Sequence, residues 1–185
     1  MKQILTIGGI SAAISIVLGL ILKFAVGPAT MLSTGYLIFS SILGIVILVV
    51  LGRKFLRTEE FPSLSYGEAL KYLFPAGLLA YVITMLFSVV LYQNDPVMKE
   101  AFTEYTVKAA QTGVELGMTL AGAGDDEAKI AIEKEKVAAE TRANADEAYP
   151  FQFSKMPLNV LNGLIAALIN ALIASIFVKY NNKSA

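Results

Sequence analysis

The sequence predicts an all-α membrane protein, a four-helix transmembrane bundle with a long extramembrane helical hairpin between the third and fourth membrane helices. Hydrophobic residues make up 56% of the 185 residues and charged residues only 16%, whereas a soluble domain is about 25% charged. Four long stretches carry no charge at all, and a segment rich in charge, residues 95–155, separates the last two of them.

Each uncharged stretch is long enough to be a transmembrane helix. About 20 apolar residues in a helix cross a hydrocarbon core roughly 30 Å thick. Lipid offers no hydrogen-bonding groups, so the backbone N–H and C=O groups of a span must bond to one another, as they do in a helix. The first stretch is longer than the apolar core of about 7–15 residues in a signal peptide, which favours a retained helix over a cleaved leader. The four stretches are Ile4–Leu22, Phe24–Gly52 (richest over Tyr36–Leu51), Tyr72–Asn94 and Met156–Val178.

A helix start is predicted just before the third span. Ser65 and Glu68 fit a capping box. In this motif the serine side chain accepts a hydrogen bond from the backbone N–H of the glutamate, and the glutamate side chain accepts one from the backbone N–H of the serine. Pro75 lies ten residues after Ser65. A proline inside a helix removes one hydrogen bond, so we expect a kink there.

Basic residues predict that both termini are cytoplasmic, because short loops rich in Lys and Arg stay on that side. Lys23 is the one basic residue between the first two spans. We expect its ammonium to reach outward as an interfacial anchor; a transport site is the alternative. The cytoplasmic group consists of Lys2, Arg53, Lys54, Arg57, Lys71, Lys179 and Lys183.

These assignments divide the single domain into three parts. Residues 1–94 hold the first three membrane helices, and residues 156–185 hold the fourth helix and a cytoplasmic tail. Residues 95–155 form the extracytoplasmic hairpin and carry seven basic and twelve acidic residues. A segment of that length translocates with little regard to its charge.

The first hairpin helix should begin at Asp95-Pro96, with Asp as the N-cap and Pro in the first turn. Gly122 and Gly124 should end it, Asp125 or Asp126 should cap the second helix, and Pro150 should end that one. Apolar residues recur along the first helix at Met98, Phe102, Tyr105, Ala109, Leu116 and Leu120. Phe102, Tyr105, Leu116 and Leu120 are therefore the candidate partner-binding residues, and a solvated spacer is the alternative to a docking arm.

Small residues line one face of the first and fourth spans. Such faces let helices approach closely in lipid, so we expect these two spans to pack on each other; a homodimer seam is the alternative. The helix-packing residues are Gly8, Ala12, Ser15 and Gly19 in the first span and Gly163, Ala167, Ala171 and Ala174 in the fourth.

Polar side chains within the spans are the other candidates. Asn162 and Asn170 in the fourth span should form interhelical polar contacts with Thr84 and Ser88 in the third, since polar groups in lipid face the bundle. Structural hydrogen bonding is the simpler interpretation. A polar path for a ligand is the alternative.

Composition narrows the chemistry. The chain has no Cys and no His, which removes disulfides, thiolate nucleophiles and the commonest general base and metal ligand. We therefore expect no cofactor, no metal and no enzymatic activity. The formal net charge of zero argues against electrostatic capture of nucleic acid.

Three short segments resemble one family. They are Leu64–Lys71 before the third span, Asn94-Asp95-Pro96 after it, and Val160–Ile165 in the fourth span. Together they are similar to the family called domain of unknown function 4199, small multi-pass membrane proteins mainly of Bacteroidota. The resemblance covers nearly the whole chain and implies a bacterial inner-membrane protein of the same layout, without catalytic residues to carry over.

The leading functional hypothesis is a non-catalytic accessory or scaffold subunit that lies in the lipid bilayer and whose hairpin binds a protein partner, or a second copy of the chain. The alternative is a component of a small oligomeric transporter or channel. Transporters usually keep charged residues within their spans, and none lies mid-span here. A membrane enzyme comes third, since Glu59, Glu60 and Glu68 are its only inner carboxylates.

Overall fold

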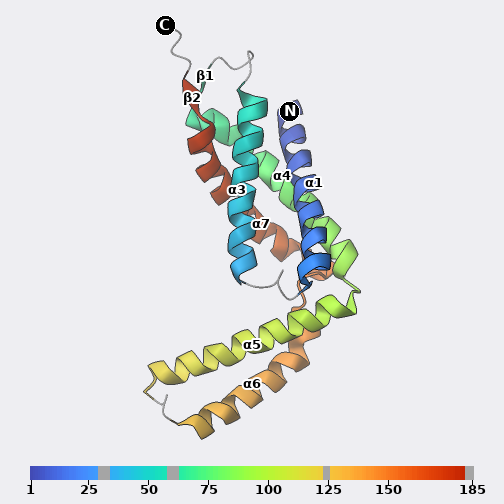
Figure 1. Cartoon of the computed structure of the whole chain (residues 1–185), viewed down its shortest axis with the longest axis vertical. Coiled ribbons are helices and arrows are strands. Elements are labelled where there is room, and N and C mark those ends of the chain that lie inside the picture. Colours follow the sequence, from blue (N-terminus) through green and yellow to red (C-terminus); the bar gives the residue numbers. More distant parts are fainter. Residues whose placement is uncertain (29–33, 58–62, 123–125, 182–185) are drawn as a thin grey trace.

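A computed structural model describes residues 1–28, 34–57, 63–122 and 126–181, and these ranges are almost entirely helical (Figure 1). The long apolar helices are α1 (Lys2–Val26), α3 (Thr34–Leu56), α4 (Tyr66–Tyr92) and α7 (Met156–Val178). Between α4 and α7 lie α5 (Pro96–Leu120), α6 (Glu127–Ala148) and the short 3₁₀ helix η1 (Phe153–Lys155). Two short strands, β1 (Ser63–Leu64) and β2 (Tyr180–Asn181), form an antiparallel pair. Lys183, Glu59, Glu60, Gly124 and Asp125 lie outside the described residues.

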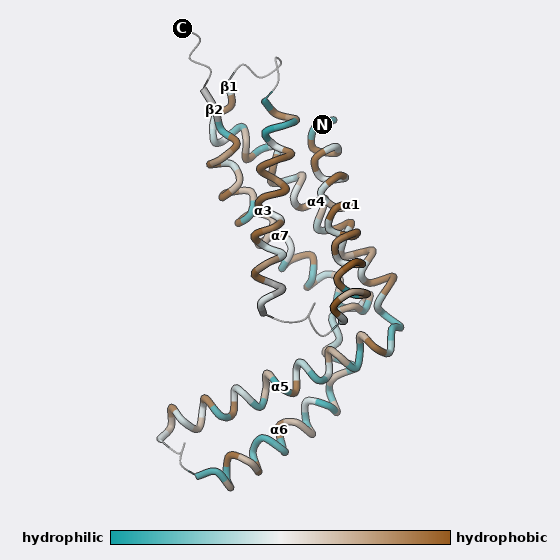
Figure 2. The backbone as a smooth tube through the Cα atoms, viewed as in Figure 1, coloured by the Kyte–Doolittle hydropathy of each residue, from teal (hydrophilic) through white to brown (hydrophobic). Residues whose placement is uncertain are grey.

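Among the described residues, four helices are long and apolar enough to cross a membrane. Figure 2 shows the contrast between these brown helices and the paler, teal-marked α5 and α6. Large apolar side chains such as Val17 and Ile21 of α1 and Val46 and Val50 of α3 point outward. An apolar outer surface of this extent is typical of helices that face lipid.

The four apolar helices form a ring in which α1 packs on α4, α4 on α7, α7 on α3, and α3 on α1. The prediction that the first and fourth spans pack on each other is therefore wrong: α4 lies between them. Both small faces do permit close approach, but to α4. A Cβ on Gly8 would lie 2.8 Å from the Ala76 carbonyl oxygen, and one on Gly163 would lie 1.9 Å from Cε1 of Tyr81.

The tightest apolar packing lies toward the end of the bundle that carries both termini. The buried side chains there come from all four long helices and from β1. A face of small residues allows a close helix contact but does not specify which helix will pack against it. The order of the four helices around the core could therefore not be derived from the sequence. The core consists of Ile7, Ile47, Leu48, Leu51, Leu56, Leu64, Ala69, Leu73, Ala76, Ala171, Ala174 and Val178.

Two arginines cap the last helix at this same end. Arg53 Nε donates to the Phe177 carbonyl oxygen at 3.1 Å, and Arg57 Nε donates to the Val178 carbonyl oxygen at 3.2 Å. Cations at a helix C-terminus satisfy its free carbonyl groups and oppose its dipole. The basic loop that sets the predicted orientation thus also holds α7 in place.

The predicted helix starts are confirmed. Ser65 Oγ accepts from the Glu68 N–H at 3.3 Å, and Glu68 Oε2 accepts from the Ser65 N–H at 2.8 Å, which completes the capping box. Asp95 caps α5, and Asp126 Oδ1 caps α6 by accepting from the Lys129 N–H at 3.1 Å. Pro75 lies inside α4, which continues as one helix from Tyr66 to Tyr92.

Helices α5 and α6 pack side by side and run across the end of the bundle opposite the termini (Figure 1). We call Pro96–Ala148 the arm. On α5, the side that faces α6 includes the buried Val107, and on α6 the buried Ala138 and Ala145 allow close approach. Lys134 Nζ and Glu115 Oε2 form an ion pair between the two helices at 2.7 Å.

Candidate functional site

Two features of the described residues gather polar groups: the junction between the bundle and the arm, and a cavity inside the bundle. The junction is built on a buried cluster of Tyr92 at the end of α4, Met98 in the first turn of α5, and Tyr149 just after α6. Phe102 and Phe151 pack against this cluster. The ring centroids of Phe102 and Tyr149 lie 5.5 Å apart in an edge-to-face arrangement.

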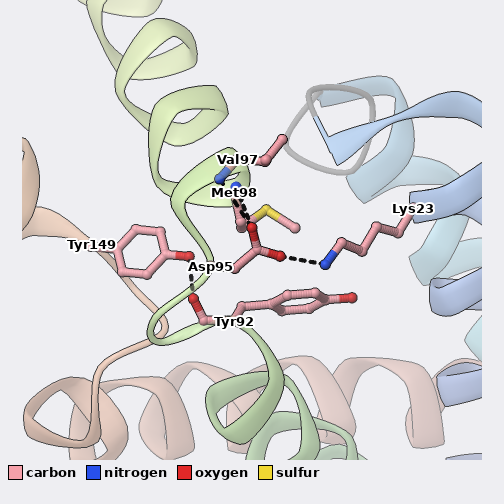
Figure 3. A network of polar contacts seen from close by, with 6 residues as sticks. All are labelled: Lys23, Tyr92, Asp95, Val97, Met98 and Tyr149. Carbon is pink, nitrogen blue, oxygen red and sulfur yellow. Dashed lines mark hydrogen bonds and ion pairs between the residues drawn. The ribbon is translucent and has the colours of Figure 1, made fainter.

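Hydrogen bonds tie the junction to three helices, as Figure 3 shows. The Tyr149 hydroxyl donates to the Tyr92 carbonyl oxygen at 2.8 Å. Asp95 Oδ1 accepts from the N–H groups of Val97 and Met98 at 3.0 and 3.1 Å, while its Oδ2 is paired with the Lys23 ammonium from the end of α1.

The structure adds two partners to the predicted anchor Lys23. At the end of the bundle that carries the arm, its ammonium bonds to Asp95 and lies 4.7 Å from the centroid of the Tyr92 ring. Both favourable charge–charge and cation–π contacts hold it there. Asp95, the predicted N-cap of α5, thus has a second role as the partner of a cation 72 residues away.

The charges of the junction shift the pKa of two groups. The Lys23 ammonium, with help from the N–H groups that bond to the carboxylate, lowers the pKa of Asp95, although burial opposes the shift. Burial raises the pKa of the Tyr149 hydroxyl, and the nearby Asp95 carboxylate adds to that rise. The ion pair and the neutral tyrosine therefore both persist at neutral pH.

The second feature is a cavity of about 400 Å³ in the middle of the bundle, to which all four long helices contribute. In the part of the chain that the structure describes, its polar lining consists of hydroxyl groups and one amide, without a carboxylate or a cationic group. Ser11 and Ser15 of α1 lie one turn apart, as required for both to face the same side. The polar lining residues are Ser11, Ser15, Ser40, Ser41, Tyr81, Thr84 and Asn170.

Ser11 is the least satisfied of these groups. Its side chain is 5% exposed, and among the described residues its Oγ is the buried side-chain oxygen or nitrogen without a hydrogen-bond partner. Burying such a group without a partner costs about 1–3 kcal/mol. Ser11 lies in the wall of the central cavity.

A second cavity of about 260 Å³ lies between α4 and α7, toward the arm. Tyr81 and Thr84 line both cavities. The Tyr81 ring lies over Gly163, and its hydroxyl donates to the Asn159 carbonyl oxygen at 3.0 Å, which bridges α4 and α7. Tyr81 and Thr84 are therefore the residues that the two spaces share.

The predicted interhelical polar residues divide into two groups. Asn170 and Thr84 both line the central cavity. Ser88 lines the second cavity and donates to the Thr84 carbonyl oxygen of its own helix at 2.9 Å. Asn162 is exposed on the outside of α7, so the prediction is wrong for this residue. Asn162 lies eight residues before Asn170, and eight residues turn a helix by about 80° beyond two full turns. Asn162 therefore points away from the packed face.

The small residues of the sequence prediction also have definite places. Gly8, Ala12, Gly163, Ala167 and Ala171 are buried. Gly19 is half-buried, and Ser15 is a cavity residue. Ser11, Ser40, Ser41 and Tyr81 were not predicted as site residues, although small polar residues within uncharged spans were a visible signal.

Of the candidate partner-binding residues, Phe102 belongs to the junction and Tyr105 is half-buried. Leu116 and Leu120 are 60% and 79% exposed. Leu116 lies nine residues after Val107, and nine residues turn a helix by about 180° relative to the starting side. The exposed leucines therefore point away from α6.

Four long apolar helices, an uncharged cavity among them and a two-helix arm at one end define a multi-pass membrane protein. The chain belongs to the family described as protein of unknown function (DUF4199), whose model matches residues 6–180. This match confirms the resemblance that the sequence motifs indicated. Comparison with curated proteins and with solved structures gives no match.

Proposed function

We propose that the chain is a non-catalytic accessory or scaffold subunit of a bacterial inner membrane, and that its arm binds a partner protein on the extracytoplasmic side. The observation that carries this proposal is the exposure of Leu116 and Leu120 on the face of α5 that points away from α6. Exposed large apolar side chains that lie together on an ordered helix mark interaction surfaces.

From Tyr105 onward, the face of α5 around Leu116 is free of charge. Tyr105, Ala109, Thr112, Leu116 and Leu120 follow one another on this side, since α-helical residues are spaced by about 100°. The charged residues of α5 project at least about 80° away from the line through Leu116. They are Lys99, Glu100, Glu104, Lys108 and Glu115.

The charge of the arm favours a protein over the lipid surface as the partner. Helices that lie on a membrane carry Lys and Arg on their polar face, which anionic lipids attract. Here α5 carries three acidic and two basic residues, and α6 carries six acidic and four basic residues. An arm with this negative balance is repelled by anionic lipid.

The place of the arm favours a partner that lies in the same membrane. The chain turns from α4 into α5 within three residues, Gln93–Asp95. The arm then crosses the end of the bundle and extends beyond it (Figure 1). In this view α5 lies between the bundle and α6, so the face of α5 that points away from α6 is turned toward the level of the bundle end, where the extramembrane part of a neighbouring membrane protein would reach it (Figure 1).

The orientation is part of the proposal. Arg53, Lys54, Arg57 and Lys71 lie at the end of the bundle that carries both termini, and the arm lies at the opposite end (Figure 1). The positive-inside rule therefore supports cytoplasmic termini and an extracytoplasmic arm.

Site-specific photocrosslinking in intact cells tests the proposal. A photoreactive residue at Leu116 or Leu120 should give one discrete protein adduct. The same residue at Ile132, which is 66% exposed on α6, is the matched control and should give none. Leu116→Asp should abolish the adduct formed at Leu120, whereas Ile132→Asp should leave it intact. Adducts with lipid alone, or equal adducts at all three positions, would refute partner binding by this face.

A further inference from the structure

We propose that the central cavity is a binding site for a small uncharged polar molecule that carries both apolar surface and hydrogen-bonding groups. This inference goes beyond the accessory role of the arm, because it concerns the opposite part of the molecule and uses none of the arm residues. It starts from Ser11, whose buried Oγ has no partner among the described residues although it stands in the wall of a cavity.

The lining determines the charge of the occupant. None of the described residues that line the cavity is Asp, Glu, Lys or Arg. An ion inside a membrane bundle needs a counter-charge or a water-filled path to offset its lost hydration. An uncharged molecule has no such requirement.

The lining also determines the hydrogen-bonding character of the occupant. The hydroxyls of Ser11, Ser15 and Thr84 can each donate and accept, and the Asn170 amide can do both at separate atoms. Ile47 and Leu48 add apolar wall. A molecule with hydroxyl, carbonyl or amide groups on one side and a hydrocarbon side on the other matches this mixture.

The size of the cavity is that of an organic ligand. Ligand sites range from about 300 to 1,000 Å³, and the cavity of about 400 Å³ lies within that range. A single water molecule takes about 30 Å³ in the liquid, so one water satisfying Ser11 would leave most of the volume to another occupant.

Access is available from the arm side of the bundle. The second cavity extends from Tyr81 and Thr84 to Pro150 and Phe151, the segment that links α6 to η1. Tyr81 lines both cavities, and its hydroxyl donates to the Asn159 carbonyl oxygen. On the proposed entry path the occupant passes the Tyr81 ring, which we therefore assign the part of a gate.

The absence of Cys from the chain allows a direct test with single cysteines. Ser11→Cys in the full-length protein, in lipid nanodiscs, is treated with methyl methanethiosulfonate, which is small and uncharged. The anionic sulfonatoethyl and cationic trimethylammonioethyl analogues serve as charged probes, with each rate normalised to the rate in SDS. We expect the uncharged reagent to react roughly 100-fold faster than either charged one, from the cost of a charge at mid-membrane. We also expect its rate to level off with concentration, as for a molecule held before it reacts.

Ser175→Cys is the matched control, because Ser175 is fully buried in α7, donates to the Ala171 carbonyl oxygen and does not line the cavity. It should react with none of the reagents. Ser15→Cys, one turn from Ser11, is the second cavity variant, and its reactivity supports the site if Ser11→Cys does not fold. Two inert cavity variants, equal rates with charged reagents, or a rate that stays proportional to concentration would each overturn the proposal.

The gate is tested in the Ser11→Cys background. Tyr81→Ala should speed labelling because the ring is lost. Tyr81→Phe keeps the ring over Gly163 and removes only the bond to Asn159, so it should speed labelling less. A Tyr81→Ala variant that folds and labels at the unchanged rate would refute entry through the second cavity.

Discussion

Replacing Lys23 with methionine should weaken the junction between the bundle and the arm. Lys23 and Asp95 form an ion pair in which each side chain is 15% exposed. An exposed pair contributes about 0.2–1 kcal/mol, and removing one partner of a buried pair costs about 3–5 kcal/mol. At this intermediate burial, we expect Lys23→Met to lower the free energy of unfolding by about 1–3 kcal/mol.

A double-mutant cycle separates the ion pair from the helix cap. Asn is as good an N-cap as Asp, so Asp95→Asn should keep the bonds from the N–H groups of Val97 and Met98 and lose only the charge. The double variant should then lose less free energy of unfolding than the two single variants lose together. Reversible unfolding of the purified protein in mixed micelles with increasing SDS measures all four free energies. Strict additivity would mean that the two charges do not interact, and would refute the reasoning.

The same pair predicts a dependence of stability on pH. In the folded protein Lys23 lowers the pKa of Asp95 below its ordinary value of 3.8. A carboxyl with a lowered pKa stabilises the fold when it is ionised, so its contribution is fully present above about pH 5 and is lost as the pH falls through 3.8 toward the lowered pKa. The stability difference between wild type and Lys23→Met should shrink over that window. A difference that stays constant there would show that Lys23 acts through packing alone.

Two further predictions concern packing and orientation. Gly163→Ala would place a Cβ 1.9 Å from the Tyr81 ring, and this overpacking should lower the free energy of unfolding by about 1–3 kcal/mol. Gly9→Ala is the control, because its new Cβ has no heavy atom within 4 Å, and its stability should be nearly unchanged. Equal stability of the two variants in SDS unfolding would contradict this prediction. A fluorescent protein that matures only in the cytoplasm, fused to the C-terminus, should fluoresce because basic residues hold that end inside. A dark fusion combined with an active periplasmic reporter at the same point would reverse the topology.

Local features of the fold were predictable from the sequence because their causes are local. A run without charge is long enough to be a membrane helix wherever it lies in the chain. The capping box at Ser65 and Glu68 and the N-cap at Asp95 depend on atoms three residues apart or fewer. The family motifs likewise follow from short stretches of sequence.

The candidate site was predictable only in part. Asn170 and Thr84 were identified because polar groups in uncharged spans turn inward, and both do line the cavity. Asn162 was placed wrongly: it lies about 80° around the helix from Asn170, which is enough to expose it on the outside of α7. Ser11 carries no local sign that its hydroxyl lacks a partner, because that depends on what three other helices place around it.

The sequence by itself determined which segments are long and apolar enough to lie in hydrocarbon: the four long helices are, and the two helices of the arm are not. Only the tertiary structure decided which helices are neighbours. Small faces on α1 and α7 specify close approach but no partner, and α4 took both places through Ala76 and Tyr81. The same holds for the ion pair between Lys23 and Asp95, whose residues are 72 positions apart. Periodicity and charge act along one chain segment, whereas packing and ion pairing depend on distances in space that only the folded bundle fixes.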